Sequence, residues 1–213
     1  NRALRALETF GVDPSITREE FFKYKFDVEY SRESILSGVR NRYIKEMESE
    51  EISDDLLPGF ELIKDWNLRA DSLNTSAALS ILTLPNAFKP ENLKYDRDSI
   101  TIKLRENMSY LKKQYGRIDV PLGRVVRLVR GETSLPLSGG PGTLRAIYSK
   151  KSGKNYKAVA GDCYIQAVEW GPEGQLNAWS IHQYGSSTMD KTSPHFDDQS
   201  KYFSKHELKV IRP

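Results

Sequence analysis

Residues 156–184 read YKAVAGDCYIQAVEWGPEGQLNAWSIHQY. Apolar and aromatic residues form three runs in this stretch, and glycine, proline and acidic residues that favour turns separate them. Runs of this length and composition are typical of strands. We therefore expect this part of the chain to form β-sheet that includes a hairpin. The three runs are residues 156–160, 163–170 and 176–184.

A polar loop is expected after the sheet-forming stretch. Residues 185–199 begin with Gly185-Ser186-Ser187 and end with the run SPHFDDQ at 193–199. Small and hydrogen-bonding residues of this kind hold a loop in place through bonds between side chains and backbone. We expect an ordered loop that has no hydrophobic core of its own.

The residues before the sheet favour helices. Residues 17–20, TREE, fit a capping box that opens one helix, and Ser31 is expected to cap a longer one in which apolar residues recur at helical spacing. A loop is expected over residues 85–98, because this segment has two prolines and no period. Helices are expected around residues 4–10, 17–24, 31–47, 56–66, 74–82 and 99–115.

The composition changes after Gly116. Prolines, glycines and β-branched residues replace the helix formers that dominate the first half. We therefore predict an α+β fold with two domains, a helical lobe at residues 1–116 and a β-rich part at residues 117–213.

Overall composition limits the partners that can be expected. The chain has 213 residues and a formal net charge of only +3, which does not favour binding to nucleic acid or to an anionic membrane. No apolar run approaches the roughly 18 residues of a membrane span. The one cysteine, Cys163, stands in an apolar run, so we expect a buried core residue rather than a reactive thiol.

Residues 138–142, SGGPG, form a glycine-rich segment that is neither helix nor regular strand. The segment lacks the Gly-Lys-Ser/Thr ending of a P-loop and does not fit the dinucleotide-binding pattern. We interpret it as a tight structural turn rather than a phosphate site.

The histidines are the candidates for metal or acid–base chemistry. His195 and Asp197 would share one face of an extended segment, and His182 could approach from a neighbouring strand as a third ligand. The alternative is a histidine hydrogen-bonded within a loop. His206 is the third histidine of the chain. Because no other His or Cys has ligand spacing, we expect no metal and no cofactor.

A Ser-His-Asp triad could also be assembled from Ser186 or Ser187 with His195 and Asp197. No Gly-x-Ser-x-Gly elbow accompanies these residues, so we do not predict a triad. A basic segment precedes them and could contact an anionic partner, but few aromatic residues are interleaved with it and we expect a solvated face. Its members are Arg124, Arg127, Arg130, Arg145, Lys150, Lys151 and Lys154.

Several motifs in register resemble the penicillin acylase family, and the resemblance covers nearly the whole chain. One of them, WNLRADS at 66–72, has Asn67 where an aspartate is common in the family. The others are PLSGGPGTLRA at 136–146, AGDCY at 160–164, GSS at 185–187 and SPHFDDQ at 193–199.

The resemblance implies an N-terminal-nucleophile amidohydrolase that cleaves itself into an α chain and a β chain. In this family a serine at the start of the β chain attacks a linear amide, and its own α-amine is the base. A backbone N–H and an asparagine side chain stabilise the oxyanion. Penicillins, acyl-homoserine lactones and similar N-acyl compounds are the substrates implied, and the strands are expected to complete part of an αββα sandwich.

The resemblance also implies that this chain is the C-terminal portion of a β chain. Residue 1 is Asn, and we expect the nucleophilic serine and the oxyanion asparagine to lie upstream, so that the chain alone is inactive. Arg2 matches a family arginine that helps to orient that asparagine, because its spacing to Thr17 is similar; the alternative is a surface arginine. Arg2 is therefore the one predicted catalytic-site residue.

The implied partners are the α chain and the N-terminal part of the β chain from the same precursor, together with a small N-acyl substrate. A periplasmic or secreted location is implied by the resemblance alone. The alternative is a stand-alone, non-catalytic binding or interaction module derived from the acylase fold.

Overall fold

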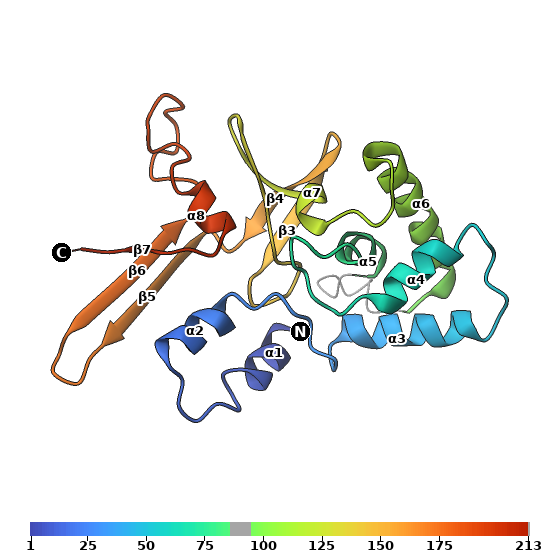
Figure 1. The fold of residues 1–213 in the computed structure, drawn as a ribbon, viewed down its shortest axis with the longest axis horizontal. Coiled ribbons are helices and arrows are strands. Elements are labelled where there is room, and N and C mark those ends of the chain that lie inside the picture. The colour runs from blue at the N-terminus through green and yellow to red at the C-terminus, as the bar shows by residue number, and fades with distance from the viewer. Residues whose placement is uncertain (86–94, 213) are drawn as a thin grey trace.

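The computed structural model describes residues 1–85 and 95–212. It is an α+β structure in which, among the described residues, six helices precede Gly116 and the strands follow residue 125. Figure 1 shows the helices α3 to α6 gathered at one end and the hairpin of β5 and β6 extending at the other. The α+β class predicted from the sequence is confirmed, whereas the division into domains at residue 116 stays a prediction.

Local sequence explains where the helices begin and end. Thr17 and Glu20 form the predicted capping box of α2, and Gly116 ends α6 in the left-handed region at a φ of 78°. The cap of α3 is Ser34, which accepts from the Ser37 N–H, and the prediction of Ser31 is wrong. The bounds are α1 Arg2–Glu8, α2 Arg18–Lys25, α3 Ile35–Glu48, α4 Leu57–Asp65, α5 Ala77–Thr83 and α6 Arg97–Tyr115.

The loop predicted over residues 85–98 falls largely on 86–94, which lie outside the described residues. Its last residues do not form a loop as predicted, because α6 already begins at Arg97. Asp96 caps this helix by accepting from the backbone N–H groups of Asp98 and Ser99.

The strands form two sheets. The first has the order β2-β1-β4-β3, with β1 parallel to β4 and the other pairs antiparallel. The second has the order β5-β6-β7 and is antiparallel. The strands are β1 Val126–Arg130, β2 Thr133–Pro136, β3 Ile147–Ser152, β4 Asn155–Gly161, β5 Tyr164–Trp170, β6 Leu176–His182 and β7 Lys209–Val210; α7 Leu122–Val125 precedes them and α8 Ser200–Ser204 follows β6.

The three apolar runs are all strands, as predicted, but they do not share one sheet. β5 and β6 form the hairpin, while β4 pairs with β3 and β1. Gly161 ends β4 before the connection to β5 and has a φ of 121°, and a Cβ there would lie 2.1 Å from the Ala146 carbonyl oxygen. Cys163 lies in this connection and is exposed, so the prediction of a buried core residue is wrong.

One cluster of buried side chains connects the helices with both sheets. Its largest members on the helical side include Tyr43, Phe60 and Trp66, and it continues through Leu128 on β1 to Phe203 on α8. Burying a side chain of this size contributes about 1.5–3 kcal/mol relative to leaving it exposed. The packing of the helices on the sheets therefore fixes the positions of the segments that connect them.

Candidate functional site

A cavity of about 300 Å³ lies where the start of α1 meets the start of α3. The end of α5 and the glycine-rich segment 138–142, here called the glycine loop, complete its walls. Most of its lining is apolar, with Arg2 and Asn1 among the polar residues. The lining residues are Asn1, Arg2, Ala3, Tyr30, Ser34, Ile35, Leu36, Ile81, Leu84, Pro141 and Gly142.

The glycine loop passes closely over its neighbours. A Cβ on Gly139 would lie 2.4 Å from the Arg145 carbonyl oxygen, and one on Gly140 would lie 2.4 Å from the Tyr30 hydroxyl oxygen. Gly139 also has a φ of 114°, which side chains rarely adopt. The segment is thus a tight turn that places Pro141 and Gly142 on the cavity wall.

Arg2 is the first residue of α1 and lines this cavity with an exposed side chain. Its charge acts on Tyr148 of β3: burial raises the pKa of Tyr148, and the positive charge of Arg2 opposes that rise. Arg2 therefore presents a cation at the edge of a mostly apolar cavity.

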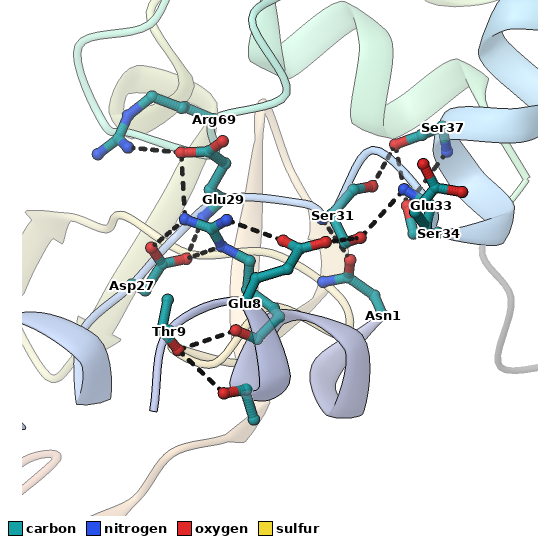
Figure 2. A network of polar contacts seen from close by, with 12 residues as sticks. Asn1, Glu8, Thr9, Asp27, Glu29, Ser31, Glu33, Ser34, Ser37 and Arg69 are labelled. Carbon is teal, nitrogen blue, oxygen red and sulfur yellow. Dashed lines mark hydrogen bonds and ion pairs between the residues drawn. The ribbon is translucent and has the colours of Figure 1, made fainter. Parts of the chain in front are cut away.

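An ion-pair network holds α1 in place (Figure 2). Arg5 donates to both carboxylate oxygens of Asp27, at 3.2 and 2.9 Å, and to Glu8 at 2.9 Å. Glu29 lies 3.4 Å from Arg5 and also pairs with Arg69 at 3.0 Å. The Asp27 hydrogen bonds are the largest cause that raises the pKa of Arg5, so its guanidinium stays charged in this network.

Three arginines of the basic segment are structural rather than solvated, which corrects the prediction for them. Arg145 is fully buried and donates to Asp162 at 3.2 Å and to the Phe203 carbonyl oxygen at 3.1 Å. Arg130 lies over the ring of Phe196, and Arg127 donates to the Gly123 carbonyl oxygen at 2.7 Å.

The candidate triad is not assembled. His195 pairs with Asp198 at 3.1 Å rather than with Asp197, whose carboxylate accepts a hydrogen bond from Thr133. Ser187 donates to the Asp190 carbonyl oxygen at 3.2 Å. These contacts fit the predicted ordered loop, and neither the His195 ring nor the Asp197 carboxylate pairs with the Ser187 hydroxyl.

The histidines do not meet at one metal site either. His182 lies beside the Tyr164 ring, at 4.8 Å between centroids, and His206 stacks on Phe26 at 4.9 Å. Within residues 1–85 and 95–212, no group of three or more His, Cys, Asp or Glu side chains is arranged to hold a metal ion. No helix of these described residues is long and apolar enough to cross a membrane.

Sequence analysis singled out Arg2, whose catalytic role stays a prediction, but missed the residues that hold α1 in place. The Arg5–Glu8 pair could have been read from its spacing of three residues. The role of Asn1 could not be predicted from the sequence, because its side chain bonds to Ser31 and to Gly142, which are 30 and 141 residues away.

The fold and the cavity define an α+β protein with an arginine at the edge of an apolar site, and comparison with known families assigns its class. A family model described as Penicillin amidase matches residues 1–212. The chain therefore belongs to the penicillin amidase family, which indicates an acylase, that is, an amidohydrolase.

Proposed function

We propose that this chain is the C-terminal portion of the β chain of an N-terminal-nucleophile acylase, and that it hydrolyses a linear amide together with the rest of the same precursor. The family match over residues 1–212 supports this proposal most directly. In the proposed mechanism an upstream serine attacks the amide carbonyl with its Oγ, and the α-amine of that serine takes the proton. The α-amine passes this proton to the amide nitrogen as the C–N bond breaks, so the amine leaves and an acyl-enzyme ester remains, which water then hydrolyses.

We propose that Arg2 is the residue of this chain that takes part in the reaction. The transition state carries negative charge on the former carbonyl oxygen, which preorganised donors stabilise. The resemblance assigns one such donor to an upstream asparagine that an arginine orients. The position of Arg2 on the cavity wall supports this role, because its side chain is exposed and its planar group of five N–H donors can bond to an upstream segment.

The cavity suits an N-acyl substrate. Ile81, Leu84 and Leu36 offer apolar surface, while Arg2 offers a charge at the edge. A penicillin or an acyl-homoserine lactone joins an apolar acyl group to a polar amine component across one amide bond. We propose a substrate of this class, acted on in the periplasm or outside the cell.

The first experiment replaces Arg2 in the full-length enzyme. Arg2→Ala is expected to lower kcat about tenfold to a hundredfold, since loss of a whole oxyanion donor costs about 10²–10³ and Arg2 acts through one. Arg2→Lys keeps the charge but not the fork of donors, so most of the loss should persist. The measurement is amide hydrolysis per titrated active site.

The matched control is Arg32→Ala, which removes an exposed arginine that does not line the cavity. Its kcat should equal that of the wild type. In parallel, replacing the upstream serine by alanine should abolish both self-cleavage and hydrolysis. A wild-type kcat for Arg2→Ala would reject the role of Arg2, and activity without the serine would reject the mechanism.

A further inference from the structure

The side chain of Asn1 connects three walls of the cavity. Its Nδ2 donates to the Gly142 carbonyl oxygen at 2.9 Å, and its Oδ1 accepts from the Ser31 backbone N–H at 2.7 Å. Gly142 belongs to the glycine loop, and Ser31 directly follows Tyr30, another lining residue. One amide thus ties the start of α1 to two segments that are distant in sequence.

The Asn1 side chain makes these contacts instead of capping α1. Asn1 occupies the N-cap position of α1, where an asparagine side chain usually accepts from a backbone N–H of the first turn. No cap bond of this kind is formed by its side chain. Its backbone carbonyl accepts from the Arg5 N–H at 2.9 Å, while its side-chain amide bonds to two walls of the cavity.

Ser31 makes this connection rigid (Figure 2). Ser31 is fully buried, and its hydroxyl donates to Glu8 at 2.5 Å while its carbonyl oxygen accepts from the Ser37 hydroxyl at 2.6 Å. α1 is therefore fixed to Ser31 at its first turn through Asn1 and at its last residue through Glu8. Removal of the Asn1 amide would leave the Ser31 N–H buried without its partner.

We propose that Asn1 is a positioning residue, which sets the orientation of Arg2 and the spacing between α1 and the glycine loop. The inference rests on the proposed function of Arg2, which follows Asn1 directly in the first turn of the helix. A shift of α1 moves the Arg2 side chain along the cavity edge. Displacements of about 1 Å in a positioned group are enough to lower the rate of a catalysed reaction markedly.

The test is a double-mutant cycle in the full-length enzyme. Asn1→Ala should lower kcat per titrated active site about tenfold and change KM by less than about twofold, because orientation of Arg2 matters mainly in the transition state. In the Arg2→Ala background the same substitution should have no further effect, since Asn1 acts through Arg2. A purely structural role would lower the yield of active sites and leave kcat unchanged.

Asn1→Asp is the second variant, in case Asn1→Ala yields too little matured enzyme. It keeps an oxygen acceptor for Ser31 but turns an oxygen toward the Gly142 carbonyl, so it should lose kcat as Asn1→Ala does. Leu7→Gln is the control, because Leu7 lies on the same helix with 64% of its surface exposed and does not line the cavity; its kcat should be that of the wild type.

Two results would overturn the inference while leaving the proposed function intact. The first is a wild-type kcat for both Asn1 variants when Arg2→Ala is impaired. The second is an equal loss from Asn1→Ala with and without Arg2, which would mean that Asn1 acts independently. Full activity of Arg2→Ala itself would instead reject the proposed role of Arg2, on which this inference rests.

Discussion

A buried arginine shows how single residues hold the β-rich part together. The guanidinium of Arg145 has no exposed surface, and its ring contact with Phe203 brings the charge 3.9 Å from the ring centroid. Desolvation lowers the pKa of Arg145, and the carboxylate of Asp162 opposes that effect. Since an unpaired buried charge is costly, the pair with Asp162 is what makes burial of Arg145 tolerable.

His206 lies beside this pair, and it gives the folded chain a predicted sensitivity to acid. Burial lowers the pKa of His206 from 6.5 to about 4, and the nearby charges of Arg145 and Lys25 act in the same direction, opposed by Asp71 and Asp162. The unfolded chain therefore binds a proton on this residue at a higher pH than the folded chain does. Above pH 6.5 protonation of His206 does not lower the free energy of unfolding. As the pH falls from 6.5 to about 4, the free energy of unfolding decreases by at most about 3 kcal/mol.

The variant that tests this is His206→Asn, because His206 has a φ of 63° and asparagine tolerates that conformation. Urea denaturation at pH 7 and at pH 4.5 should show a smaller loss of stability for the variant than for the wild type. His195→Asn is the control, because the His195 side chain is 63% exposed, and it should behave like the wild type. Equal losses in all three proteins would contradict the prediction.

Two glycines in helices should respond in opposite ways to replacement by alanine, one with a gain and one with a loss of stability. A Cβ on Gly38, at an exposed position of α3, would meet nothing within 4 Å, so Gly38→Ala should stabilise the chain by about 0.5–1 kcal/mol. A Cβ on Gly123 in α7 would lie 2.7 Å from Pro136 Cβ and 2.9 Å from Ser72 Cβ. Gly123→Ala should therefore destabilise it by about 1–3 kcal/mol.

Urea unfolding of the two variants at pH 7 measures the difference. Each variant is the control for the other, because both replace a glycine in a helix and only the surroundings differ. Destabilisation by Gly38→Ala, or a neutral Gly123→Ala, would show that the packing around these helices is not as described.

The elements themselves were predictable where local signals agree. The apolar stripe of Ile100, Leu104 and Leu111 predicted α6, and all three side chains are buried. Sheet membership was not predictable, because β4 and β5 are separated by only Asp162 and Cys163 and yet enter different sheets. Which strand pairs with which is decided by contacts between distant segments, such as the parallel pairing of β1 with β4.

Only those residues of the candidate site that belong to a sequence motif could be predicted. Arg2 could be singled out because its spacing to Thr17 resembles a family pattern. The cavity could not, because its walls come from four segments that are brought together by the buried core. The buried state of Arg145 was also missed, since a run of arginines and lysines reads as a solvated face until the fold supplies a partner such as Asp162.

For the molecule as a whole, the hairpin of β5 and β6 carries apolar surface on one face. Side chains on β5 alternate, with Ile165 and Ala167 buried on the face toward the protein. The opposite face exposes Tyr164 by 47%, Val168 by 37% and Trp170 by 73%. Leu176, opposite Trp170 on β6, is 63% exposed, so Val168, Trp170 and Leu176 form an apolar row, which Gln166 separates from Tyr164.

This face and the outer edge of β5 predict association. Within the described residues β5 pairs with β6 alone, so the other edge of β5 presents unpaired backbone groups beside an apolar row. On the proposed function, the rest of the proposed precursor would cover this surface. In the isolated chain a second copy should take its place, and size-exclusion chromatography with light scattering should show dimers or larger species.

Val168→Lys tests which surface is responsible, because a lysine there places a charge in the apolar row and discourages pairing of strands. The variant should shift the isolated chain toward monomer. Val159→Lys is the matched control, because Val159 is 50% exposed but lies on β4, which already has β1 and β3 on its two sides. It should associate as the wild type does. A wild-type chain that is monodisperse and monomeric would contradict the prediction, and equal effects of the two lysines would place the contact elsewhere than on the hairpin.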